Sequence, residues 1–253
     1  MGILNTTPDS FSDGGRFDSV NKALQQAQLM IADGVDIIDI GGESTRPGAQ
    51  AVSLEEEIQR VIPVIQAVRE ISDVAISIDT SKPEVMQQAV ASGADLVNDV
   101  NALQADGALE VCARLNVPVC LMHMQGEPRT MQHQPAYADV LVDVKEFLQQ
   151  RILACEEAGI KKQHIILDPG FGFGKTLAHN LSLLKHLADF SALDCPLLVG
   201  ISRKSMIGAI LDADVDDRLA GSLAAAVLAC TKGARIFRVH DVKPTVDALK
   251  ICS

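Results

Sequence analysis

The sequence predicts a single α/β domain in which eight parallel strands alternate with helices, a (β/α)8 TIM barrel whose active site lies at the carboxyl-terminal ends of the strands. Eight short apolar runs alternate with longer segments of helical period. Of the 253 residues 47% are hydrophobic but only 3% aromatic, so aliphatic side chains fill the core, as in parallel sheets buried on both faces. No Pro- or Ser-rich linker divides residues 1–253. A doubly wound open sheet is the alternative.

The expected strands are bounded by helix-start and helix-stop signals. Ser53 with Glu56, and Ser81 with Glu84, have the spacing of capping boxes at helix starts. Helices are expected to end at glycines, namely Gly34, Gly93, Gly159 and Gly233. The eight expected strands are Gly2–Asn5, Ile37–Ile40, Ile76–Asp79, Leu96–Asp99, Val117–Met122, Ile165–Asp168, Leu197–Gly200 and Arg235–Val239, and a last helix is expected near Val242–Ile251.

Polar side chains recur where these strands end. They are Asn5, Asp39, Asp79, Asn98, His123, Asp168, Ser202 and His240. Each one alone could cap the helix that follows it. Eight of them on one rim, at the end of the barrel where this fold carries its chemistry, predict an active site.

Composition excludes several functions. Lys and Arg total 22 against 33 for Asp and Glu, a net charge of −11, whereas nucleic-acid binding needs clustered cations. The uncharged run Leu219–Cys230 is shorter than the ~20 residues that cross a bilayer and is expected to form a buried helix. No secretory signal opens the chain, and the six cysteines form no CxxC pair, so we expect reduced thiols in a cytoplasmic protein.

Two loops after the first strands are rich in oxygen and glycine. The run from Asn5 to Gly15 is nearly free of cations, so it would hold a phosphate through Mg2+ shared with Asn5, since Mg2+ keeps water and phosphate ligands. The run from Gly41 to Gly48 combines glycines and hydroxyls with one Arg, which suits an oxyanion. Read in isolation, the first loop is a solvated turn.

A third loop, Asp168-Pro-Gly-Phe-Gly-Phe-Gly174-Lys-Thr176, nearly matches a nucleotide-binding P-loop. Pro169 stands where the first required glycine should be, and proline has no N–H to donate. We therefore expect no ATP site. The glycines are expected to let the backbone lie close to a flat ligand, with Asp168 pointing inward.

The last two strands are followed by cations. Gly200-Ile-Ser-Arg-Lys-Ser205 follows the seventh strand, and Arg238-Val-His240 ends the eighth. Loops at these strands are the common phosphate site of this fold. In an acidic protein, a cluster of Arg203, Lys204, Arg238 and His240 predicts that an anion binds there.

Together these segments resemble the dihydropteroate synthases over nearly the whole chain. The matching motifs, in the family's order, are Asn5-Thr-Thr-Pro-Asp-Ser-Phe-Ser-Asp-Gly-Gly15, Gly42-Glu-Ser-Thr-Arg-Pro-Gly48, Asp79-Thr-Ser-Lys-Pro83, Asn98-Asp99, Met122-His-Met-Gln-Gly126, Asp168-Pro-Gly-Phe-Gly-Phe-Gly-Lys175, Ser202-Arg-Lys-Ser205 and Arg238-Val-His-Asp-Val242. The resemblance implies a transferase of folate biosynthesis that joins a pterin methyl diphosphate to 4-aminobenzoate and is a sulfonamide target. Family members usually carry a short segment before the first strand, whereas Met1 begins at the strand here.

The resemblance also implies residue roles. The pterin edge would be held by Asp79, Asn98, Asp168 and Lys204, with Arg238 against its ring. The diphosphate would be bound by Thr45, Arg46, Arg238 and His240, with Asn5 on Mg2+. The 4-aminobenzoate pocket would be formed by Phe11, Pro47, Phe173, Ser202 and Lys204, with Asp13 holding the first loop closed. A homodimer through Leu219–Ala229 is also implied.

Two other functions compete with this one. A methyltetrahydrofolate methyltransferase would share the pterin carboxylates but needs no diphosphate site, and Ser202-Arg-Lys204 with Arg238-Val-His240 argues against it. A non-catalytic pterin-binding protein should have lost Asn5, Thr45-Arg46 or Lys204, and all are present.

Overall fold

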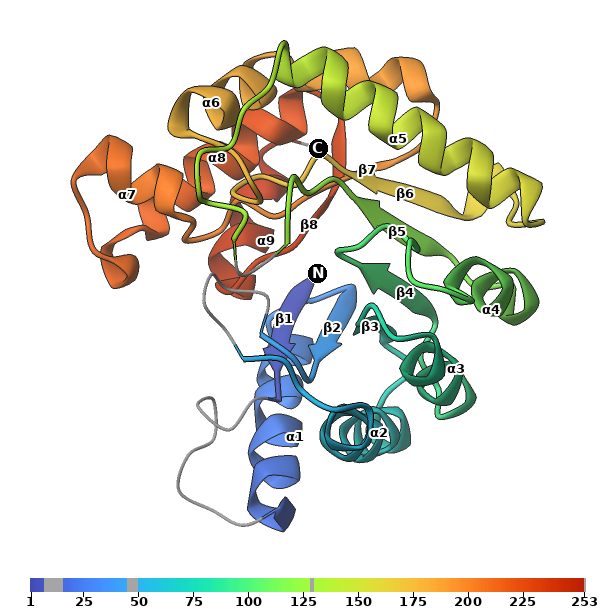
Figure 1. The fold of residues 1–253 in the computed structure, drawn as a ribbon. Helices are drawn as coiled ribbons and strands as arrows, with labels where there is room; N and C mark the ends of the chain where they lie inside the picture. Colours follow the sequence, from blue (N-terminus) through green and yellow to red (C-terminus); the bar gives the residue numbers. More distant parts are fainter. Residues whose placement is uncertain (7–15, 45–49, 128–129, 253) are drawn as a thin grey trace.

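The computed structural model describes residues 1–6, 16–44, 50–127 and 130–252. Their eight strands form one parallel sheet in sequence order, from β1 to β8 (Figure 1). Its strands are β1 (Gly2–Asn5), β2 (Ile37–Gly41), β3 (Ala75–Asp79), β4 (Leu96–Asp99), β5 (Val119–Met122), β6 (Ile165–Asp168), β7 (Leu197–Val199) and β8 (Ala234–Phe237). A doubly wound sheet reverses its strand order at a switch point, so this order excludes that alternative.

Helices follow the strands and cover the outer face of the curled sheet (Figure 1). They are α1 (Arg16–Ala32), α2 (Leu54–Ile71), α3 (Pro83–Ala91), α4 (Ala108–Leu115), α5 (Val140–Glu157), α6 (Leu177–Lys185), α7 (Ser205–Leu211), α8 (Leu219–Thr231) and α9 (Val242–Lys250), with 3-10 turns at Lys162–His164, Leu187–Leu193 and Val215–Asp217. Each connection returns the chain to the end of the sheet where the preceding strand began, so every strand points the same way.

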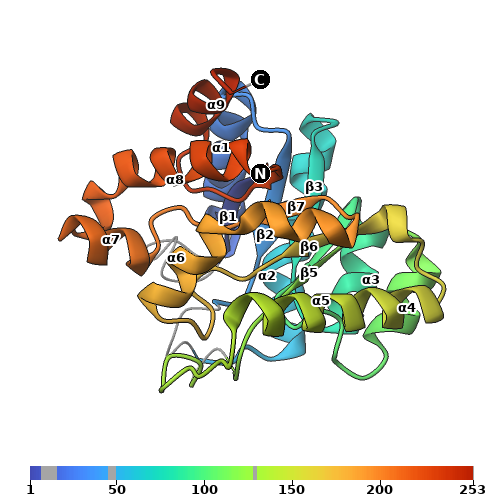
Figure 2. The same cartoon turned by 90° about the horizontal axis from the view of Figure 1, so that it is seen from above.

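The first and last elements of the chain are neighbours. The Ile3 amide donates to the Val239 carbonyl over 3.0 Å, and the Val239 amide donates to the Met1 carbonyl over 2.9 Å. Figure 2 shows α1 beside α9 where these segments meet. A Cβ on Gly2 would lie 2.9 Å from Met30 Sδ of α1 and 3.0 Å from Val242 Cγ2 of α9. Glycine therefore lets both helices pack against β1.

Most boundaries agree with the sequence-based expectation within two residues. The expected fifth strand began at Val117, but β5 begins at Val119, because Pro118 has no N–H for the ladder. The expected helix stops are confirmed. Each of these glycines follows a helix and has a left-handed φ between 85° and 113°: Gly34, Gly93, Gly159 and Gly233.

The two expected capping boxes differ. Ser53 accepts the Glu56 amide at 3.2 Å as the N-cap of α2, while the Glu56 carboxylate pairs with Arg60. The Ser81 expectation is wrong. Its hydroxyl donates to Asp99 on the next strand, and α3 begins at Pro83 without a side-chain cap.

Two apolar layers flank the sheet. The larger lies between the sheet and its helices. The smaller lines the inner face near the amino ends of the strands and consists of Met1, Leu96, Cys120, Ile166 and Leu198, with Ile37 and Ile236 packed against it. The prediction that Leu219–Cys230 forms a buried helix is confirmed in part. The helix α8 forms there and buries one face, but Leu228 is 50% exposed.

Candidate active site

The carboxyl ends of the strands carry polar side chains on the inner face. Side chains alternate along a strand, so Asp39, Asn98, Asp168 and Arg238 lie on the same face as the apolar layer, two residues farther along. Asp39 is fully buried, and Asp79, Asn98 and Asp168 are 4–8% exposed. Buried polar groups need partners, and these are found across the sheet.

Arg238, just past β8, joins two carboxylates. Its Nε donates to Asp39 Oδ2 and its Nη2 to Asp79 Oδ2, each over 2.6 Å. The Asn98 amide donates to both Asp39 oxygens over 3.3–3.4 Å. Residues 199 positions apart in the chain thus share one network. The structure confirms that Asp79, Asn98 and Arg238 lie together, and it adds Asp39 as the residue that holds two of them.

Burial sets the charges of this network. It raises the pKa of Asp79 to about 7, with Arg238 opposing the rise and Asp39 adding to it. Burial acts to lower the pKa of Arg238, but Asp39 and Asp79 outweigh it and raise that pKa above its ordinary value. Arg238 therefore stays charged, whereas Asp79 is poised to change protonation near neutral pH.

Asp168 and Lys204 form the other side of the layer. Asp168 Oδ1 accepts the Gly170 amide over 2.7 Å, and burial raises the pKa of this carboxyl against the pull of Lys204. Lys204 donates to the Phe171 carbonyl and lies 4.1 Å above the Phe173 ring. Burial lowers the pKa of Lys204 to about 8, against the attraction of Asp168.

The end of β7 contributes space instead of a side chain. A Cβ on Gly200 would lie 4.0 Å from both Asp168 Oδ2 and Arg238 Cβ. Beyond it, the Ser202 hydroxyl lies 3.1 Å from His240 Nδ1 and accepts the His240 amide over 3.2 Å. The expected neighbours Ser202 and His240 are therefore brought together.

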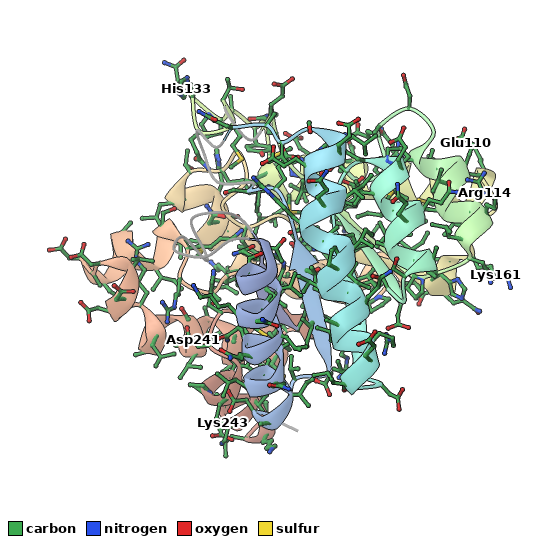
Figure 3. The ribbon with its side chains drawn as sticks, turned by 90° about the horizontal axis from the view of Figure 1, so that it is seen from below. Glu110, Arg114, His133, Lys161, Asp241 and Lys243 are labelled. Atoms are coloured by element: carbon green, nitrogen blue, oxygen red, sulfur yellow. The ribbon has the colours of Figure 1, made fainter. Side chains whose placement is uncertain are left out.

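Arg203, one of the four cations expected to bind an anion, is paired with carboxylates. Arg203 has a left-handed φ of 56° and pairs with Asp241 over 2.6–2.8 Å and with Asp216 over 3.5 Å. Asp241, labelled in Figure 3, is the N-cap of α9. Two carboxylates therefore offset the charge of Arg203, whereas Lys204 lies close enough to Arg238 for that charge to help lower the Lys204 pKa.

The stems of the second loop are tied by a carboxylate that sequence reasoning missed. Glu43 accepts the Val52 amide over 3.3 Å and pairs with Lys82, which also pairs with the buried Glu57. The expected residues Phe11, Asp13, Thr45, Arg46 and Pro47 lie outside the described residues. Asn5 ends β1 and is half-buried.

The glycine-rich turn after β6 packs against the protein itself. A Cβ on Gly170 would stand 1.8 Å from the His123 carbonyl and one on Gly174 2.3 Å from the Gln125 carbonyl. A Cβ on Gly172 would meet the Lys204 stem at 3.0 Å. The chain needs these glycines, with φ of 62–78°, to fold against Lys204 and the segment that follows β5. That they also let the backbone lie close to a flat ligand stays a prediction.

Among the described residues, no group of three or more His, Cys, Asp or Glu side chains could hold a metal ion. None of the helices in that part of the chain is long and apolar enough to span a membrane.

Comparison with known proteins identifies the family. A model of the family described as pterin binding enzymes matches residues 1–240. The dihydropteroate synthase of Escherichia coli K12 is 57% identical over 251 residues, covering 99% of this chain and 89% of that protein.

The chain belongs to the dihydropteroate synthase family. Among solved structures, the Yersinia pestis dihydropteroate synthase in a sulfonamide complex matches with a TM-score of 0.94 and 54% identity, covering 99% of this chain and 91% of that one. The Xanthomonas albilineans enzyme with 4-aminobenzoic acid matches with a TM-score of 0.94 and 50% identity, covering 100% and 90%.

Proposed function

We propose that this chain is a transferase that condenses (7,8-dihydropterin-6-yl)methyl diphosphate with 4-aminobenzoate, giving 7,8-dihydropteroate and diphosphate in folate biosynthesis. The observation that carries this proposal is that five polar side chains meet at the carboxyl ends of the strands. They are Asp79, Asn98, Asp168, Lys204 and Arg238. The full-length similarity to dihydropteroate synthases supports it.

The pterin edge would meet the buried polar groups. An aminopyrimidinone edge offers adjacent N–H groups, which a carboxylate accepts. Asp168 keeps Oδ1 on the Gly170 amide, so its second oxygen is the acceptor for the ligand. Asp79 and Asn98 would take the far side of the ring, and the Arg238 guanidinium would lie against its face. Gly200 leaves room for a flat group between Asp168 and Arg238.

The leaving diphosphate would be stabilised by cations. Arg238 and His240 would bind it together with Thr45 and Arg46, because preorganised positive charge lowers the energy of charge developing in the transition state. Mg2+, when bound, would neutralise part of this charge. Asn5 would hold it, since an amide oxygen at the end of β1 suits a cation that keeps most of its ligands as water and phosphate.

The second substrate would lie over Phe173, beside Lys204 and Ser202, with Phe11 and Pro47 completing the pocket. Lys204 lies over the Phe173 ring, and its charge suits the carboxylate of 4-aminobenzoate or the acidic group of a sulfonamide. The arylamine nitrogen is already a nucleophile at neutral pH. It therefore attacks the pterin methylene carbon without a side-chain base, while Asp13 would help to hold the first loop closed.

We further propose that residues 1–253 form one closed (β/α)8 TIM barrel. The hydrogen bonds of Val239 with Met1 and Ile3 support closure. The protein is proposed to be cytoplasmic and to bind neither nucleic acid nor membranes, in line with its net charge of −11. A homodimer through α8 would cover Leu228, which is 50% exposed.

Diphosphate release tests the proposed function. Release should require the pterin diphosphate, 4-aminobenzoate and Mg2+ together, and omitting any one should abolish it. Release without 4-aminobenzoate would indicate hydrolysis instead of condensation. Binding of the pterin without any turnover would favour a non-catalytic pterin-binding protein.

A further inference from the structure

Lys175 is a buried cation that the proposed chemistry does not use. It is 3% exposed, and its ammonium lies within 2.9–3.3 Å of four acceptors: His123 Nδ1 and the carbonyls of Gly170, Phe173 and His123. In the P-loop-like motif this is the lysine that would face a nucleotide. Here it points into its own turn and ties that turn to the end of β5.

His123 is the nitrogen partner of this ammonium. Burial lowers the pKa of Lys175 to about 7. When the lysine is charged it can only donate, so Nδ1 then accepts and the ring proton lies on Nε2. Burial, with the charge of Lys175 adding to it, lowers the pKa of His123 to about 3, which keeps the ring neutral. Its edge packs against Phe147, with ring centroids 5.0 Å apart.

Side chains bind five consecutive carbonyls of the turn after β6. Lys175 takes Gly170 and Phe173, and Lys204 takes Phe171. Gln132 donates to the Gly172 carbonyl over 2.5 Å, and Tyr137 donates to the Gly174 carbonyl over 2.7 Å. The turn has almost no regular secondary structure, so these donors set its shape. Lys175 contributes the most contacts and joins both ends of the turn.

Lys204 depends on this shape. Its ammonium is held by the Phe171 carbonyl and the Phe173 ring, and its stem passes where a Cβ on Gly172 would stand. A shift of the turn would therefore move Lys204 and Phe173 together. Asp79 and Asn98 lie on β3 and β4, and they would be left in place.

We infer that Lys175, with His123 as its acceptor, is a positioning residue that sets the 4-aminobenzoate side of the active site by holding the turn of residues 170–174. This inference rests on the proposed function. It affects the two substrates unequally. Both protein contacts proposed here for the arylamine, Phe173 and Lys204, depend on the turn. The pterin shares Lys204, and its acceptor Asp168 bonds the Gly170 amide, but it is also held by Asp79 and Asn98 on β3 and β4.

Steady-state kinetics of Lys175→Met, which keeps the chain length but removes the donors, is the test. We expect KM for 4-aminobenzoate to rise at least tenfold, while the pterin dissociation constant measured by calorimetry changes less than threefold. Lys175→Arg should recover part of the loss. Lys243→Met, at an exposed pair with Asp247, is the matched control and should change neither value.

A smaller variant allows chemical rescue. In Lys175→Ala, ammonium or methylammonium at high concentration should lower KM for 4-aminobenzoate again, and sodium at equal ionic strength should not. A merely structural lysine would show no such selectivity. If Lys175→Met does not fold, Tyr137→Phe removes one donor to the same turn and should raise KM for 4-aminobenzoate about threefold.

The two hypotheses fail in different ways. No diphosphate release by the unaltered protein contradicts the proposed function. If the unaltered protein is active but folded Lys175→Met, or its substitute Tyr137→Phe, has an unchanged KM for 4-aminobenzoate or weakens both substrates equally, the positioning role of Lys175 is wrong.

Discussion

The inner face of the sheet carries two layers of opposite character, only two residues apart along β4 and β6. On β4, Leu96 is followed by Asn98, and on β6, Ile166 is followed by Asp168. The first layer consists of apolar side chains that pack on one another. The second gathers charges that burial disfavours, as the raised pKa of Asp168 indicates. One layer stabilises the fold, and the other holds groups in place for a ligand.

Two arginines show the same contrast. Arg69, near the amino ends of the strands, donates to backbone carbonyls of three residues, Ser72, Val74 and Gly93, and pairs with Asp95. Arg238, at the carboxyl ends, pairs with two buried carboxylates. The partners of Arg69 are mostly main chain, so its role is structural. The partners of Arg238 are side chains, and one of them, Asp79, is proposed to contact the pterin.

Replacing Arg238 should have the largest effect. Arg238→Met leaves Asp39 and Asp79 buried without their cation, which costs about 3–5 kcal/mol of unfolding free energy. It also removes a group that is proposed to bind the diphosphate, so kcat/KM should fall by about 1000-fold, or ~4 kcal/mol. Kinetics and urea unfolding measure both losses.

Arg69→Met is the matched control for the opposite end. It should lower the free energy of unfolding while kcat/KM stays unchanged. An equal kinetic loss in both variants would show that the two ends are not functionally distinct.

Replacing a residue of the apolar layer should affect stability alone. Leu198 is fully buried, so Leu198→Ala should cost about 2–5 kcal/mol of unfolding free energy, from lost burial and the cavity left behind. The KM and dissociation constants of the substrates should be unchanged, because Gly200, the residue just past this strand, brings no side chain to the charged layer. A large change in KM, with the folded fraction accounted for, would contradict the separation of the layers.

Replacing Asp168 should weaken the pterin selectively. Asp168→Asn can keep its oxygen on the Gly170 amide, which turns the NH2 group toward the N–H groups of the ligand. The mismatch costs about 1–3 kcal/mol, so pterin affinity should fall at least tenfold with an unchanged circular dichroism spectrum. Unchanged affinity by calorimetry would remove Asp168 from the site.

A pH dependence of stability is expected from Asp79. The pKa of Asp79 is raised to about 7 from 3.8, so the folded state favours the protonated form. The resulting stability is complete below about pH 4 and is lost as the pH rises toward 7, with a slope of at most ~1.4 kcal/mol per pH unit. Asp79→Asn should remove this decline. Parallel unfolding curves of the two proteins from pH 4 to 7 would show that Asp79 does not titrate there.

Much of the fold follows from the sequence because its signals are local. Apolar runs and helix-stop glycines depend on neighbours a few residues away, so the strands were predicted within about two residues. The rim was predictable for the same reason. The exceptions have tertiary causes: Ser81 binds Asp99 across the sheet instead of capping a helix.

The contacts within the site were harder to predict, because the residues that pair there are far apart in the sequence. The sequence places Asp39 at a strand end but cannot show that it receives Arg238, 199 residues away. It places Arg203 and Lys204 in one cluster but gives no sign that Arg203 pairs with Asp241 and Asp216. The acid within the run Ile37-Ile-Asp-Ile40 was the available signal for Asp39.

A crystal structure with a bound pterin tests the central claim most directly. The account predicts the ring on the inner face at the carboxyl ends of the strands, with its N–H edge on Asp168 and its other polar atoms within hydrogen-bond distance of Asp79 and Asn98. Arg238 should lie against the ring. A pterin bound elsewhere, or one that leaves Asp79, Asn98 and Asp168 untouched, would contradict the account.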